Sequence, residues 1–172
     1  LNTVAERINT DRRVRGKLRV IFVENYRVSL AEKLFPASDV SEQISTAGKD
    51  ASGTGNMTFM INGALTLGTL DGANIETVEE AGADNAFIFG LTADEIHKIE
   101  KEHSDFPQKF LDRNPELAKV VNQLVDGTYD PSHQLFKELH DSLVYGVEGQ
   151  RPDVYYVLAD FDAYGDAQEK VA

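Results

Sequence analysis

The 172-residue sequence contains no cysteine, and its basic residues are few. The absence of cysteine excludes disulfide bonds, thiolate nucleophiles and zinc-thiolate sites. With 17 Lys and Arg against 29 Asp and Glu, the formal net charge is -12. A chain of this charge repels nucleic acid and anionic membranes unless a local patch reverses the field. We therefore expect neither as a partner, and we expect the basic residues that matter to be few and locally placed.

Long hydrophobic runs are also missing. The longest, LRVIFV at residues 18–23, is far too short to span a bilayer, and the charged opening segment lacks the apolar core of a signal peptide. These features predict a soluble, cytoplasmic protein. Because the chain opens at Leu1 inside a helix-like pattern, we expect it to be a fragment of something longer. Its length and 41% hydrophobic content predict one domain over residues 1–172.

Short apolar segments alternate with amphipathic segments in the first half of the chain. Residues 18–23, 64–70 and 85–90 have the composition of buried strands. A helix beginning near residue 28 is expected to end or kink at Pro36, and a short helix is expected to stop at Gly82. This alternation predicts crossover units and an α/β fold with a Rossmann-like parallel sheet.

The second half is predicted to be mainly helical. Thr92 and Glu95 form a capping box that opens one helix. Two further helices are predicted at residues 115–127 and 133–146. Residues 154–161 return to the composition of a strand. Since the histidines lie on charged helices without the pairing of metal ligands, we predict no metal site; they are His97, His103, His133 and His140.

A glycine-rich turn is the candidate binding site. Residues 52–56 read Ser-Gly-Thr-Gly-Asn, and a helix is predicted from about Asn56. Glycine permits the dihedral angles at which successive N–H groups point at one anion, and the helix adds the positive end of its dipole. The turn is neither a Walker motif nor a GxGxxG dinucleotide motif. An ordinary connecting turn has the same pattern, so both interpretations stay open.

Longer segments of the sequence resemble a known family. VIFVENYRVSLAEKLFPASDVSEQISTAG, ASGTGNM, FMINGALTLGTLDGANIE and NAFIFG closely resemble the C-terminal domain of the α-glucan phosphorylases, which act on glycogen, starch and maltodextrin. The resemblance continues more thinly through VNQLVDGTYD and YYVLADF. It implies part of a GT-B glycosyltransferase fold, pyridoxal phosphate as cofactor, and usually a homodimer. The implied reaction of the intact enzyme transfers glucosyl units from α-1,4-glucan to phosphate and yields glucose 1-phosphate.

The resemblance assigns cofactor contacts to four residues. It implies that Thr54 and Gly55 hold the cofactor phosphate through hydroxyl and backbone N–H groups, and that Tyr26 and Arg27 line the cofactor pocket. A guanidinium suits a dianionic phosphate. Without the resemblance, Arg27 would be interpreted as a solvated charge at the end of a strand.

Substrate contacts are implied at three positions of the turn. Ser52 and Gly53 match the backbone that meets the glucosyl hydroxyls. Asp50 stands where the family has a glutamate that accepts a hydrogen bond from the sugar. Because aspartate is one methylene shorter, this contact is in doubt.

The largest departure from the family is Thr58. The family has a lysine at this position, which forms a Schiff base with the cofactor. Threonine has no amine, so covalent attachment at Thr58 is chemically excluded. Lys49 is a new lysine nearby, but it precedes the turn instead of lying on the helix. We expect the isolated chain to be inactive, and the alternative is a non-catalytic phosphorylase-like paralogue or a truncated sugar-phosphate-binding domain.

Overall fold

A small parallel sheet lies at the centre of the fold. The computed structural model describes residues 1–49, 53–102 and 106–172. Strands β1 (Val40–Gln43), β2 (Leu65–Gly68) and β3 (Phe87–Ile88) pair in the order β1-β2-β3. In this register Val40 lies opposite Leu65, and Leu67 lies opposite Phe87. All pairings are parallel, as the alternation of elements predicts.

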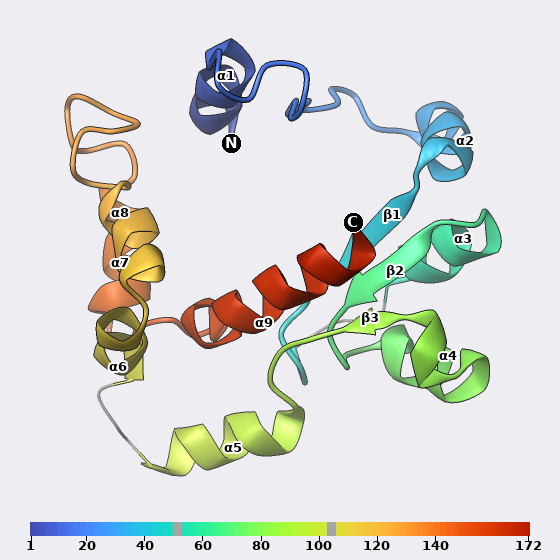
Figure 1. Cartoon of the computed structure of the whole chain (residues 1–172). Helices are drawn as coiled ribbons and strands as arrows, with labels where there is room; N and C mark the ends of the chain where they lie inside the picture. Colours follow the sequence, from blue (N-terminus) through green and yellow to red (C-terminus); the bar gives the residue numbers. More distant parts are fainter. Residues whose placement is uncertain (50–52, 103–105) are drawn as a thin grey trace.

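Helical crossovers connect these strands. Helix α3 (Gly55–Ile61) joins β1 to β2, and helix α4 (Ala73–Ala81) with the 3-10 turn η1 (Ala83–Asn85) joins β2 to β3. Figure 1 shows α3 and α4 behind the sheet and α9 (Val157–Val171) in front of it. The middle strand is therefore enclosed, and the side chain of Leu67 has no exposed surface. The predicted α/β architecture is confirmed.

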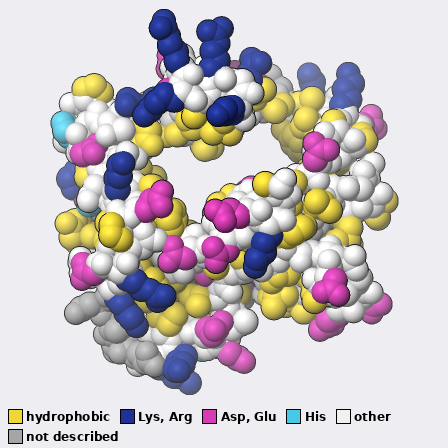
Figure 2. All heavy atoms as spheres, viewed as in Figure 1, with side chains coloured by type: hydrophobic (Ala, Val, Ile, Leu, Met, Phe, Trp, Pro, Cys, Tyr) yellow, Lys and Arg dark blue, Asp and Glu magenta, His cyan; other side chains and the backbone are white. Residues whose placement is uncertain are grey.

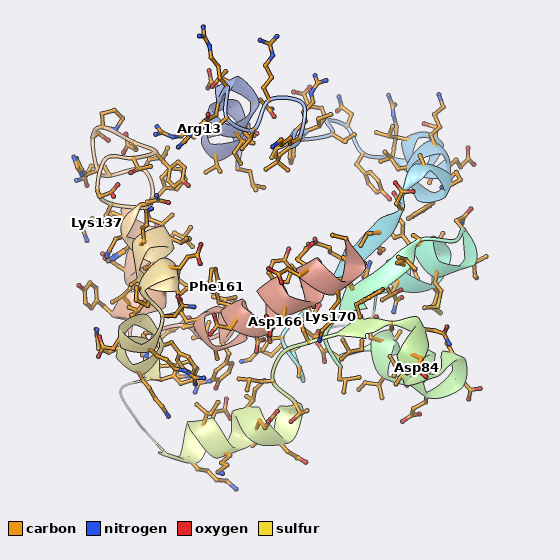
Figure 3. The ribbon with its side chains drawn as sticks, in the orientation of Figure 1. Arg13, Asp84, Lys137, Phe161, Asp166 and Lys170 are labelled. Carbon is orange, nitrogen blue, oxygen red and sulfur yellow. The ribbon has the colours of Figure 1, made fainter. Side chains whose placement is uncertain are left out.

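The second half of the chain is helical, as predicted. It contains α5 (Ala93–Glu102), α6 (Phe106–Arg113), α7 (Pro115–Asn122), α8 (Lys137–Val144) and α9. The predicted capping box is confirmed, because Thr92 N–H donates to Glu95 Oε2 at 2.8 Å and Glu95 N–H donates to Thr92 Oγ1 at 3.3 Å. Figure 3 places Phe161 where α9 meets the α6–α8 group, and it packs on a buried cluster of Leu117, Val121 and Leu158.

The N-terminal segment joins the two ends of the molecule, so that the chain forms a ring with a central opening. Helix α1 (Asn2–Thr10) and helix α2 (Val28–Ala37) are joined by an extended segment, and Figures 1 and 2 show an opening between this segment and α9. The ring is completed at Arg7, whose Nη1 donates to the carbonyl oxygen of Thr128 at 2.6 Å. The same guanidinium lies 5.9 Å from the centroid of the Tyr129 ring.

The strand predicted at residues 18–23 is wrong. This segment has no regular structure and lies on the extended connection, where Ile21 and Phe22 are 66% and 62% exposed. The Asn9 side chain engages the backbone of Val20, donating to its carbonyl oxygen at 2.7 Å and accepting from its N–H at 2.8 Å. Since both backbone groups of Val20 are occupied, they are not available for a sheet ladder.

The strand predicted at residues 154–161 is also wrong. Helix α9 begins at Val157, and Asp153 accepts hydrogen bonds from the N–H groups of Val157 and Leu158 at 2.9 Å each. These bonds satisfy two of the donors left open at a helix start. The β-branched and aromatic composition is overridden by this cap and by burial of Tyr156 and Leu158.

Helix ends follow the sequence more closely. Helix α2 ends at Ala37, one residue past Pro36, and α4 ends before Gly82, whose φ is +91°. A positive φ favours glycine, which explains the stop. The short polar strand β1 was not predicted from the sequence, because VSEQ carries too few apolar residues to mark a buried strand.

Candidate anion site at the start of helix α3

The glycine-rich turn leads directly into helix α3. Thr54 is the N-cap residue and its side chain makes no capping hydrogen bond. Within the described part of the chain, the N–H groups of Gly55 and Asn56 have no hydrogen-bond acceptor. A Cβ atom built on Gly53 or Gly55 would meet none of the described atoms within 4 Å. The start of α3 therefore combines room beside its glycines with two unused backbone donors and the Thr54 hydroxyl, an arrangement that suits a phosphoryl group.

Two buried amides hold the start of α3 against the sheet. Asn56 and Asn74 are each 5% exposed, and Asn56 Nδ2 donates to Asn74 Oδ1 at 2.9 Å. Asn74 Nδ2 in turn donates to the carbonyl oxygens of Gln43 at 3.2 Å and Thr69 at 3.0 Å. Gln43 is the last residue of β1 and Thr69 is the first residue after β2, so the turn is fixed relative to the carboxyl ends of both strands. That edge of an open α/β sheet is where ligands ordinarily bind.

The segment entering the turn is anchored at the same edge. Gly48 N–H donates to Asp71 Oδ1 at 2.7 Å, and Thr69 Oγ1 donates to the carbonyl oxygen of Ser45. Asp71 is 6% exposed. The sequence analysis assigned no role to the side chains of Asn56, Asp71 and Asn74, although an asparagine soon after a glycine at a helix start was a visible signal.

Thr58 lies one helical turn beyond the cap, on the same helix. Its Oγ1 donates to the carbonyl oxygen of Thr54 at 3.2 Å, the local bond that a threonine often makes inside a helix. No amine is present at this position. The ammonium group of Lys49 lies over the Tyr155 ring, 6.0 Å from its centroid.

The remaining predicted site residues are not brought to the turn. Tyr26 is 61% exposed and Arg27 is the N-cap of α2. Among the residues with described positions, no hydrogen bond, ion pair or ring contact joins either of them to residues 53–58. Asp50 and Ser52 lie outside the described residues. The structure thus assembles Gly53, Thr54, Gly55 and Thr58 as one continuous element, and the cofactor roles of Tyr26 and Arg27 stay predictions.

A hollow of about 280 Å³, separate from the glycine-rich turn, lies between α9 and the carboxyl ends of the strands. It is lined mainly by apolar and aromatic side chains, and Asp160 contributes a carboxylate. Burial raises the pKa of Asp160, against the opposing effect of the Leu91 N–H, which donates to Asp160 Oδ1 at 2.8 Å. The hydrogen bond shows that this carboxylate serves to join α9 to the loop after β3.

The described ranges contain neither a candidate metal site nor a candidate membrane span. No group of three His, Asp or Glu side chains there is arranged to hold a metal ion. Likewise, no helix in those ranges is both long enough and apolar enough to cross a membrane.

These features define an α/β domain with a candidate anion site where its first crossover helix begins. A family profile described as carbohydrate phosphorylase matches residues 1–172, and the chain belongs to that family. It is 47% identical to glycogen phosphorylase of Bacillus subtilis over 99% of this chain and 21% of the relative. Identity to the human liver and muscle forms of glycogen phosphorylase is 49%, over 100% of this chain and 20% of each relative. The chain thus spans about a fifth of the length of these relatives.

Proposed function

We propose that the chain is part of an α-glucan phosphorylase, which in the intact protein transfers glucosyl units from α-1,4-glucan to phosphate and forms glucose 1-phosphate. The observation that carries this proposal is the match of all 172 residues to the carbohydrate phosphorylase family. The relatives are named as glycogen phosphorylases. The backbone N–H groups of Gly55 and Asn56, which have no acceptor among the described residues, support a place for a phosphate group at the start of α3. The GT-B architecture, the homodimer and the cytoplasmic location belong to this proposal.

The proposed cofactor is pyridoxal phosphate. Thr54 would hold its phosphate through the hydroxyl, and Gly55 would do so through the backbone N–H, since neither donor is used within the described chain. When bound, the cofactor supplies a phosphate group that can relay a proton next to the substrate phosphate. Asn56 and Asn74 orient the turn toward the sheet edge. Thr58 offers only a hydroxyl, so any cofactor at this site is held without a covalent bond to residue 58.

Titration of the 172-residue chain with pyridoxal phosphate, followed by visible absorbance, tests the binding. We expect saturable binding that dialysis reverses and that Thr54→Ala weakens several-fold, because one donor to a charged phosphate is lost. Borohydride reduction followed by peptide mass spectrometry tests the attachment. The wild-type chain should carry no adduct on residues 53–61, whereas T58K should carry one. Asn62→Ala, at the opposite end of α3, is the matched control and should bind like wild type.

A stoichiometric adduct on the wild-type helix α3 would refute the role given to Thr58. Binding that is unchanged by Thr54→Ala would refute the role given to the turn. A reduced adduct on Lys49 would instead show that this lysine replaces the missing amine, and K49A would then abolish it.

Thr58 specifically favours a second candidate, a non-catalytic phosphorylase-like protein. A hybrid in which this chain replaces the matching fifth of Bacillus subtilis glycogen phosphorylase separates the two. If formation of glucose 1-phosphate appears only in the T58K hybrid, loss of the amine has silenced an otherwise competent scaffold. Activity of the unsubstituted hybrid would exclude the non-catalytic candidate. A folded hybrid that is inactive with either residue would exclude a competent catalytic site in this chain.

A further inference from the structure

Charge is distributed very unevenly along the chain. Residues 1–27 contain seven of the 17 Lys and Arg but only three of the 29 Asp and Glu. Figure 2 shows the resulting row of basic side chains on the rim of the ring, over the connection between α1 and α2. The other elements in this view carry most of the acidic side chains. A local patch thus reverses the field of an acidic molecule.

Most of these cations are unpaired. Residues 12–19, here named the basic arch, contain Arg12, Arg13, Arg15, Lys17 and Arg19. Only Arg13 has an ion pair among the described residues, with Asp11, whose Oδ2 lies 2.5 Å from Arg13 Nη2. Hydrogen bonds from Arg13 lower the pKa of Asp11 to about 2. The positive charges of the other four are available to a ligand.

Three of the unpaired cations line one open hollow. It has a volume of about 600 Å³ and is lined by Asn9, Arg15, Gly16, Lys17, Leu18 and Arg19. The backbone that carries them is fixed at both ends, because α1 precedes it and the Asn9 carboxamide makes paired hydrogen bonds to Val20. Gly16 provides the turn between them with a φ of +81°. Figure 3 shows Arg13 on the arch, outside the set that lines the hollow.

We propose that the basic arch binds a small anion that carries two or more phosphate groups. The three cations at this hollow match the negative charge of a pyrophosphate group. A monocarboxylate or a single phosphate would leave part of their positive charge uncompensated. Guanidinium groups match phosphate oxygens in pairs, and Lys17 adds a point charge. The volume lies within the range of small-molecule sites. A long polyanion fits less well, since it would extend from the arch across the acidic remainder of the molecule.

This site is separate from the glycine-rich turn and does not depend on the proposed enzymatic function. Isothermal titration calorimetry of the 172-residue chain with inorganic pyrophosphate tests it. We expect 1:1 binding that the triple variant R15Q/K17Q/R19Q weakens by about tenfold or more, since each removed cation contributes a modest exposed charge contact. The control K33Q/K98Q/K119Q removes the same net charge from exposed lysines that do not line the hollow. It should weaken binding by less than about twofold, and raised salt should weaken binding in the wild type.

Further ligands distinguish the sources of the phosphates. A nucleoside diphosphate that binds like pyrophosphate indicates recognition of the phosphates alone, and one that binds more tightly indicates that the base is also recognised. Inorganic phosphate should bind more weakly than either. In amide NMR spectra, pyrophosphate should shift resonances of residues 9–20 in the wild-type chain, and the triple variant R15Q/K17Q/R19Q should lose these shifts.

Several outcomes would overturn the proposal. These are absence of measurable pyrophosphate binding, an equal loss in the two triple variants, or shifts confined to the glycine-rich turn. Tighter binding of a single-stranded oligonucleotide than of pyrophosphate would assign the patch to nucleic acid. Circular dichroism melting of both triple variants verifies folding. None of the substituted side chains makes a described hydrogen bond or ion pair, so their melting should match wild type.

Discussion

Removal of the Asn74 side chain should disconnect the glycine-rich turn from the sheet. Asn74 is 5% exposed, and its carboxamide makes three hydrogen bonds, two to backbone carbonyls and one from Asn56. In Asn74→Ala the carbonyl oxygens of Gln43 and Thr69 lose these donors, and the Asn56 amide loses its acceptor. The bonds to Asn56 and Thr69 are buried and the bond to Gln43 is partly buried. Each of the two carbonyl oxygens keeps one backbone donor, so no acceptor is left without a partner.

The magnitude follows from these three bonds. A net contribution of about 1 kcal/mol for each gives a destabilisation of about 3 kcal/mol for Asn74→Ala. Asn56→Ala loses the bond to Asn74 and the one that Asn56 Oδ1 accepts from Met57 N–H at 2.8 Å, so about 2 kcal/mol is expected. The Asn56–Asn74 bond is lost in both variants. The double variant should therefore cost about 4 kcal/mol, with a coupling of about 1 kcal/mol.

Urea unfolding followed by circular dichroism measures these differences. Asn62→Ala is the control at the other end of α3. It removes one exposed hydrogen bond, from Asn62 Nδ2 to the carbonyl oxygen of Thr58 at 2.8 Å, and should cost less than about 1 kcal/mol. Loss of under about 1 kcal/mol in Asn74→Ala, or strict additivity of the two single variants, would refute the buried amide connection. Pyridoxal phosphate should also bind more weakly to Asn74→Ala than to the control.

Three further variants test packing and protonation. Gly68→Ala should cost about 1–3 kcal/mol in urea unfolding, because its Cβ would lie 2.7 Å from the carbonyl oxygen of Gln43; a neutral effect would contradict this close approach. Thr66→Val should be neutral or stabilising by up to about 1 kcal/mol, since the buried Thr66 hydroxyl has no partner among the described residues, whereas a loss above about 1 kcal/mol would reveal one. Asp160→Asn should remove one pH dependence of stability, because burial raises the pKa of Asp160 in the folded chain. The measured quantity is the unfolding free energy of wild type minus that of D160N. It should fall as pH rises from about 4 through the raised folded pKa, and then level off. A difference that rises with pH would reverse the assigned shift.

Local chemistry accounts for the features that were predicted correctly. The Thr92–Glu95 capping box, the end of α2 just after Pro36 and the stop at Gly82 each depend on neighbouring residues of the chain. The parallel sheet follows from alternation of apolar strands and crossover helices. The same information was insufficient for β1, whose four residues are mostly polar and are defined by pairing with β2.

The two wrong strand predictions, which were based on apolar composition, have the same cause. Residues 18–23 and 154–161 both have β-branched and aromatic side chains, but composition does not specify a pairing partner. In the structure, the Asn9 side chain occupies the backbone of Val20, and Asp153 caps a helix that begins at Val157. Both interactions depend on which groups meet after folding.

Residue order and side-chain chemistry were enough to predict the alternating α/β plan, the family, the glycine-rich turn and the lack of an amine at Thr58. They did not show that Asn56 contacts Asn74, 18 residues away, or that Arg15, Lys17 and Arg19 line one hollow; the fold reveals both. The physical reason is that hydrogen bonds and charge clusters form between groups that folding brings within a few ångströms, and residue order does not contain those distances.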